Sequence, residues 1–224
     1  MVDFHVMLSA GTVSGGMDAA SALRYASLAG LRFVGLTLIS DGSDLARVRD
    51  VAAHVRRLSL YADMEARVGV ELHHVPPALL PDTVREAREC GAEIVLVHGE
   101  TLCDQVEPGT NFAAVEAGAD IIAHPGLIDE KCAEFAAERG VALEFTSCPR
   151  HGLANAHVAD LAVRFGCLLV RGSAARCASE LTTRAFWGQI IRGADVFGKI
   201  DGKSNLLKLM EDSESALIRK CSHF

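Results

Sequence analysis

The segment Val-Gly-Val-Glu-Leu-His-His-Val-Pro, residues 68–76, places a carboxylate and two imidazoles at the end of an apolar run. A short run rich in valine is typical of a buried β-strand. Because side chains alternate between the two faces of a strand, Glu71 and His73 are expected on one face. Leu72 and His74 then share the other face, where we expect His74 to pack behind the sheet.

Three other apolar runs combine an acidic residue with a terminal histidine. They are Asp3-Phe-His5, Glu93–His98 and Asp120–His124. Parallel strands end at the same edge of a sheet, so these side chains are expected to gather there. The repeated pattern predicts a ring of ligands at one end of a barrel.

Strand-like and helix-like segments alternate along the chain. Strands are expected over residues 2–8, 32–39, 67–75, 93–98, 120–124, 141–146 and 167–171. Helices are expected over residues 17–29, 43–59, 78–90, 110–117, 129–139, 157–165, 182–192 and 204–219, with Ser43 as an N-cap.

This alternation predicts an α/β fold with a parallel sheet that helices cover. A (β/α)7 TIM-like barrel fits better than an open sheet, because no GxGxxG motif follows the first strand. Polar residues also end many strands instead of meeting at one switch point. We expect a single barrel domain over residues 1–224 with a helix at its C-terminal end.

The bulk properties exclude several classes of protein. With 224 residues, 50% hydrophobic content and a net charge of −7, the chain can bury a core and shows no basic surface for nucleic acid. It lacks a basic leader and an apolar run of about 20 residues, so neither a signal peptide nor a membrane partner is expected. The seven cysteines form no CxxC pair, which predicts reduced thiols and a cytoplasmic location.

Several segments together resemble the PHP (polymerase and histidinol phosphatase) family, especially its short histidinol-phosphatase-like members. They are Asp3–His5, Gly69–Pro77, Val97–Thr101, Pro108–Asn111 and Ala123–Ile128. The resemblance implies the PHP fold, a distorted seven-stranded barrel. It also implies up to three divalent metal ions and the hydrolysis of phosphate esters by a metal-activated water.

The resemblance further implies that Glu71, His98 and His124 hold one divalent ion, aided by His5. A carboxylate with imidazoles suits Zn²⁺, Mn²⁺ or Fe²⁺. Other ligand positions of the family are replaced, which implies a degenerate centre, because cluster hydrolysis needs ions on both the attacking and the leaving oxygen. The replaced positions carry Met7, Ile39, Ala174 and Arg176.

A guanidinium in place of a metal ligand suggests an anion site. Arg176 could pair with Glu71 or bind a phosphate or carboxylate. Arg150 and His151 are further candidates for substrate or anion binding, and His73 shares the face of Glu71.

Other buried or clustered groups need partners. Glu144 lies inside a strand, where either Arg176 or a metal ion could pair with it, and Arg171 could extend the anion site. Glu100 is expected to tie its own loop. Three cysteines that follow strands are expected on the same face, as a thiolate site, a reactive thiol or ordinary loop thiols. They are Cys103, Cys148 and Cys177.

Three functional hypotheses remain open. The first is a PHP-fold phosphoesterase relative with a degenerate centre, weakly active or non-catalytic, that binds one metal ion or an anionic ligand. The second is an active metal-dependent phosphoric ester hydrolase of the histidinol-phosphatase type. The third is a scaffold like the RNase P protein subunit, which the pI of 5.7 opposes. The expected ligand is a small phosphorylated or anionic molecule, and a homo-oligomer is compatible with the sequence.

Overall fold

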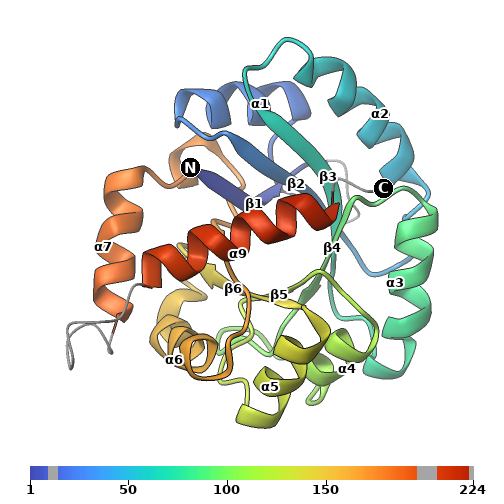
Figure 1. The fold of residues 1–224 in the computed structure, drawn as a ribbon. Coiled ribbons are helices and arrows are strands. Elements are labelled where there is room, and N and C mark those ends of the chain that lie inside the picture. The colour runs from blue at the N-terminus through green and yellow to red at the C-terminus, as the bar shows by residue number, and fades with distance from the viewer. Residues whose placement is uncertain (10–14, 196–205, 222–224) are drawn as a thin grey trace.

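A seven-stranded parallel barrel forms the centre of the molecule (Figure 1). The computed structural model describes residues 1–9, 15–195 and 206–221. Neighbouring strands pair in chain order, which confirms the predicted (β/α)7 TIM-like barrel. The strands are β1 (Val2–Met7), β2 (Phe33–Ser40), β3 (Glu65–Leu72), β4 (Ile94–His98), β5 (Ile121–Ala123), β6 (Ala142–Thr146) and β7 (Leu169–Gly172).

The ring closes less regularly between its first and last strands. A single parallel bridge joins Val6 to Ala175, and the Met7 amide donates to the Ala175 carbonyl at 2.8 Å. The register between β1 and β2 also shifts after Asp3. These irregularities make the barrel a distorted one.

Helices surround the strands, and their apolar faces pack against the outside of the barrel (Figure 1). The predicted start of the second helix was wrong, because Ser43 lies in a turn and α2 begins at Arg47. The helices are α1 (Ala19–Leu28), α2 (Arg47–Ser59), α3 (Leu80–Glu89), α4 (Thr110–Glu116), α5 (Glu130–Arg139), α6 (Asn155–Phe165), α7 (Arg184–Ala194) and α9 (Leu206–Cys221). Short 3₁₀ turns cover Pro77–Leu79, Gly152–Ala154 and Ala178–Glu180.

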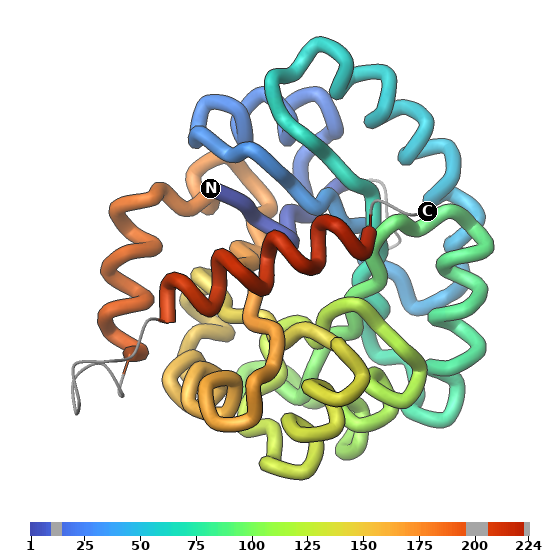
Figure 2. The backbone as a smooth tube through the Cα atoms, viewed as in Figure 1, coloured from blue at the N-terminus to red at the C-terminus, as the bar shows by residue number. Residues whose placement is uncertain are grey.

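The last helix closes the end of the barrel at which the strands begin (Figure 2). Leu217 and Cys221 of α9 join the apolar cluster inside the barrel, which includes Val2 and Phe4. The start of the predicted final helix, residues 204–205, lies outside the described residues. The opposite end of the barrel, where the strands finish, is therefore the end left for a functional site.

Arg171 of β7 is bound to α9, so the prediction that it extends an anion site was wrong. Its guanidinium donates to both carboxylate oxygens of Glu214 at 2.6 Å. Both side chains are buried. The pair holds α9 across the barrel at the end remote from the histidines.

None of the helices in the described part of the chain has the length and apolar composition that crossing a bilayer requires.

Backbone strain gathers where strands end. Three residues other than glycine in the described chain have a positive φ: His74 at 55°, His124 at 35° and Ala174 at 51°. They follow β3, β5 and β7, all at the same end of the barrel. Such conformations are unfavourable for residues with a side chain and cluster at binding and catalytic sites.

Candidate metal centre

Five ionisable side chains meet inside the barrel near the carboxyl ends of the strands. They come from β1, β3, β4, the residue after β5, and β6, and each is at most 4% exposed. The alternation of side chains along each strand turns them inward, as it does the apolar residues nearer the strand starts. The five are His5, Glu71, His98, His124 and Glu144.

Three of these side chains direct one atom each to a common point. His98 Nδ1 lies 2.9 Å from Glu71 Oε1 and 2.9 Å from His124 Nε2. His124 Nε2 lies 3.6 Å from the same Glu71 oxygen. Ligand atoms about 2.1 Å from one ion, at angles of about 90–110°, stand about 3.0–3.4 Å apart. The triangle therefore fits a single divalent ion with little adjustment.

The other nitrogen of each of these two histidines faces a carboxylate. His124 Nδ1 lies 3.1 Å from Glu144 Oε2, and the His124 amide donates to the same oxygen at 2.9 Å. His98 Nε2 lies 3.5 Å from Asp104 Oδ2, an ion-pair distance longer than a good hydrogen bond. Metal-binding histidines commonly have such a carboxylate behind them, which fixes the ring and its tautomer.

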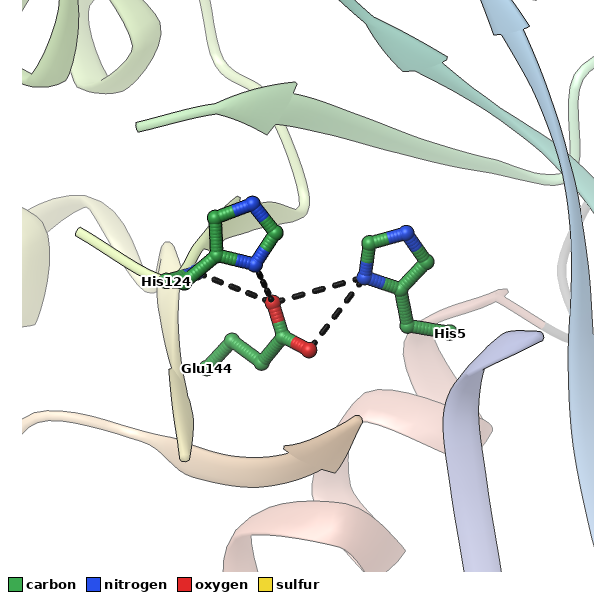
Figure 3. A group of neighbouring side chains, drawn as sticks. All are labelled: His5, His124 and Glu144. Atoms are coloured by element: carbon green, nitrogen blue, oxygen red, sulfur yellow. Dashed lines mark hydrogen bonds and ion pairs between the residues drawn. The ribbon is translucent and has the colours of Figure 1, made fainter. Parts of the chain in front are cut away.

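His5 bridges the two buried glutamates. Its Nε2 lies 3.1 Å from Glu71 Oε2, and its Nδ1 lies 3.2 Å from Glu144 Oε1, as Figure 3 shows for the second contact. Burial lowers the pKa of His5, but the two carboxylates outweigh burial and hold that pKa well above its usual value. Burial likewise raises the pKa of Glu71, and His5 and His98 reverse this to well below the ordinary value. In this arrangement His5 serves as the cation between two anions.

Close groups of three metal-binding side chains occur twice among the described residues: His5–His124–Glu144 and Glu71–His98–His124. In the first group, His5 already lies against both carboxylates. In the second, two imidazole nitrogens face each other at 2.9 Å, which is favourable only if a proton or an ion lies between them. A divalent ion would also offset the two buried carboxylates. The second group is therefore the better candidate.

Two further histidines extend the centre toward the rim. The His151 ring stacks on His124 at 4.0 Å, and the His73 ring lies 3.9 Å from His98. Burial and the neighbouring imidazoles lower the pKa of both His73 and His151 to about 4, so both are neutral at neutral pH. His74 is exposed, so the prediction that it packs behind the sheet was wrong.

The predicted contacts of Arg176 were also wrong. Its Nε donates to Met7 Sδ at 3.2 Å, while Glu71 and Glu144 pair with His5 instead. Arg176 lies nearer the rim, where Arg150 donates to Asp104 at 2.9 Å. Both guanidiniums line a cavity of about 560 Å³ beside the histidines.

Several smaller predictions concern residues in the loops that follow the strands. Glu100 ties its loop as expected, because its Oε1 accepts from the amides of Gly109 and Asn111. The groups of three close metal-binding side chains found in the described chain include no cysteine, so a thiolate site is not supported. The Cys103 thiol donates a hydrogen bond to the Arg150 carbonyl, and Cys177 Sγ lies 3.1 Å from Ser179 Oγ.

Asp104 is the contributor that the sequence analysis missed. It lies in the loop between β4 and α4, a few residues beyond His98, where no strand periodicity predicts the direction of a side chain. It contacts His98, Arg150 and, at 3.9 Å, His151. The sequence signal that could have identified Asp104 was its position, an acidic residue shortly after the candidate ligand His98.

The glycine at the end of β7 leaves room for the buried carboxylate. A Cβ on Gly172 would overlap Glu144 Oε1 and stand 2.9 Å from His5 Cβ. We expect Gly172→Ala to lower the free energy of unfolding by about 1–3 kcal/mol, because overpacking must displace Glu144. Urea unfolding would measure this.

Gly188, inside α7, is the matched control for that substitution. A Cβ added there would meet no atom within 4 Å, so Gly188→Ala should be neutral or stabilise the helix by roughly 0.5–1 kcal/mol. Equal effects at the two positions would contradict the crowding around Glu144.

The chain is similar in sequence to a known protein and similar in fold to several solved structures. The uncharacterized protein MJ1295 of Methanocaldococcus jannaschii is 34% identical over 167 residues, 72% of this chain and 77% of that protein. The crystal structure of an amidohydrolase matches 88% of this chain and 71% of its own, with a TM-score of 0.53 and 15% identity. A Xaa-Pro dipeptidase with bound methionine matches 97% and 73%, with a TM-score of 0.53 and 13% identity. No protein-family model matches the chain.

These findings overturn the resemblance to the PHP family. The similar solved structures include an amidohydrolase and a dipeptidase, and no family model supports a PHP domain. At identities of 13–15% those structures show the barrel fold alone. The phosphoester specificity that the resemblance implied loses its support, whereas histidine and glutamate groups that could bind a metal ion are present.

Proposed function

Because the chain belongs to the same family as MJ1295 of Methanocaldococcus jannaschii, which is itself uncharacterized, we propose a function from the site: a metal-dependent hydrolase that cleaves an amide or ester bond. The observation that carries the proposal is the convergence of Glu71 Oε1, His98 Nδ1 and His124 Nε2 within 2.9–3.6 Å of one another. Two imidazoles and one carboxylate leave further coordination positions open, as catalytic sites require.

The donor set suits Zn²⁺, Mn²⁺ or Fe²⁺ better than Mg²⁺ or Ca²⁺, which prefer oxygen ligands. When bound, such an ion would polarise a carbonyl oxygen and make a water molecule acidic enough to attack at neutral pH.

The surrounding residues position these three ligands. Glu144 holds the His124 ring through Nδ1, and Asp104 stands behind His98. His5 restrains the second oxygen of Glu71. Glu71 can therefore present its other oxygen to the ion while its remaining charge is balanced.

The names of two proteins with a similar fold support an amide bond as the bond that is cleaved. Their names, amidohydrolase and Xaa-Pro dipeptidase, denote hydrolysis of amide bonds. A barrel of this kind hosts many reactions, so fold alone does not choose among them. The gathering of imidazole and carboxylate ligands at the strand ends favours hydrolysis by a metal-activated water.

A direct test begins with the full chain stripped by a chelator and reloaded with one equivalent of Zn²⁺, Mn²⁺ or Fe²⁺. Hydrolysis of p-nitrophenyl acetate and of aminoacyl p-nitroanilides is expected with at least one ion. His98→Ala should lower the rate by more than the roughly 10- to 100-fold typical of losing an outer partner. His54, exposed on α2, supplies the control His54→Ala. Turnover that is indifferent to both the ion and His98 would refute the proposal.

A further inference from the structure

A cavity lies beside the candidate metal centre, at the same end of the barrel. The cavity of about 560 Å³ is lined by loops that follow β6 and β7 and by the start of α7. His151 belongs to this lining and stacks on His124 at 4.0 Å. A molecule in the cavity would therefore lie beside a ring that packs directly on a candidate ligand.

Two guanidiniums give the cavity a positive wall. Arg176 Nε donates to the thioether of Met7, a weak acceptor. Within the described parts of the chain, no carboxylate forms an ion pair with the Arg176 guanidinium. The Glu180 carboxylate, which also lines the cavity, accepts from the Arg176 backbone amide at 2.7 Å instead. Arg150 is 62% exposed and shares Asp104 with the histidines. An incoming anion could thus bind Arg176 without first displacing a carboxylate from its guanidinium.

The rest of the lining is largely apolar or already satisfied. Phe186 is 49% exposed and, with Leu181, gives the cavity an apolar surface. The hydroxyls of Ser147 and Thr182 bond to each other at 2.6 Å. Ala174, strained at φ 51°, also faces the cavity, and such strain is commonly kept for a binding role.

We propose that this cavity is the substrate subsite of the hydrolase and that it selects molecules with an anionic group on an apolar body. The anionic group, a carboxylate or a phosphate, binds Arg176 and Arg150, and the body lies against Phe186 and Leu181. The inference rests on the proposed function, because the subsite gains its meaning from the adjacent metal centre.

The test uses binding instead of turnover, so it stands or falls separately from the hydrolase assay. Phenylacetate and phenyl phosphate are the two anionic probes, and benzyl alcohol is the neutral one. Cys148 lines the cavity, so a bound probe should slow its alkylation by iodoacetamide, followed peptide by peptide in a mass spectrometer. Cys90, half-buried at the end of α3, provides the internal control.

We expect one or both anions, and not benzyl alcohol, to protect Cys148 while Cys90 reacts as before. Arg176→Gln should lower the affinity for the protecting anion about tenfold, because it removes one charge-assisted hydrogen bond. Arg192→Gln, in the last turn of α7 and on a separate cavity, should change nothing. The stronger of the two anions identifies the headgroup.

Three results would overturn the proposal. Equal protection by benzyl alcohol would show that the cavity binds apolar molecules without regard to charge. Protection that Arg176→Gln leaves intact would place the anion on the metal ion instead. No protection by either anion would show that the subsite does not exist. A chain that binds the anions yet hydrolyses nothing would instead contradict the proposed function alone.

Discussion

Replacing His124 with alanine is expected to lower the affinity for a divalent ion by more than about 100-fold, because it removes one of three ligands. His151→Ala should change the affinity by only a few fold, although that ring stacks on His124. Asp104→Asn should fall between them, at about 10- to 100-fold, since it alters a group behind His98. The ranking tests which imidazoles bind the ion.

Competition with a chromogenic chelator measures these affinities, and circular dichroism establishes that each variant is folded. His5→Ala distinguishes the two close groups of side chains, because His5 belongs to one of them and not to the other. If the ion lies at Glu71–His98–His124, His5→Ala should lower the metal affinity less than His124→Ala does. A larger loss in His5→Ala would place the ion at His5–His124–Glu144 instead.

The sequence predicted that these side chains gather, because apolar runs end in or near them and parallel strands finish at the same end of a barrel. Glu71 and His98 lie on regular strands, and His124 follows a strand of only three residues. The choice of these three as metal ligands came from the resemblance to the PHP family and stays a prediction. The barrel followed from the repeated alternation of strands and helices.

Positions outside the regular elements were the ones that the sequence could not settle. Asp104 lies in a loop, and a loop residue has no period that predicts its direction. Arg176 was matched with Glu71 because it stands in place of a metal ligand of the PHP family, but His5 contacts that carboxylate and already balances its charge. Arg171 was assigned to the wrong end of the barrel because its partner, Glu214, belongs to a helix distant in sequence.

That partnership between Arg171 and Glu214 gives the largest expected effect on stability. Arg171→Met should lower the free energy of unfolding by about 3–5 kcal/mol, because it leaves the Glu214 carboxylate buried without its cation. The double variant Arg171→Met with Glu214→Leu removes both charges and should recover most of that loss. Urea unfolding of the two variants and the unchanged chain would measure the difference.

The pH dependence of the single variant supplies a second signature. Burial already raises the pKa of Glu214, and Arg171 opposes that rise. Without Arg171 the pKa should rise further. A carboxyl group with a raised pKa in the folded state destabilises the protein when ionised. The loss in Arg171→Met should therefore be largest at neutral pH and should shrink as the pH falls toward the ordinary value of 4.5.

The ion pair between Arg164 and Glu130 provides the control, because it has a similar distance of 2.7 Å but lies exposed. Arg164→Met should leave the unfolding midpoint nearly unchanged, since solvent already screens both charges. If Arg171→Met were no more harmful than Arg164→Met, the position of α9 would depend on its apolar contacts alone. A large difference would show that the buried pair secures the helix that closes the barrel opposite the buried histidines.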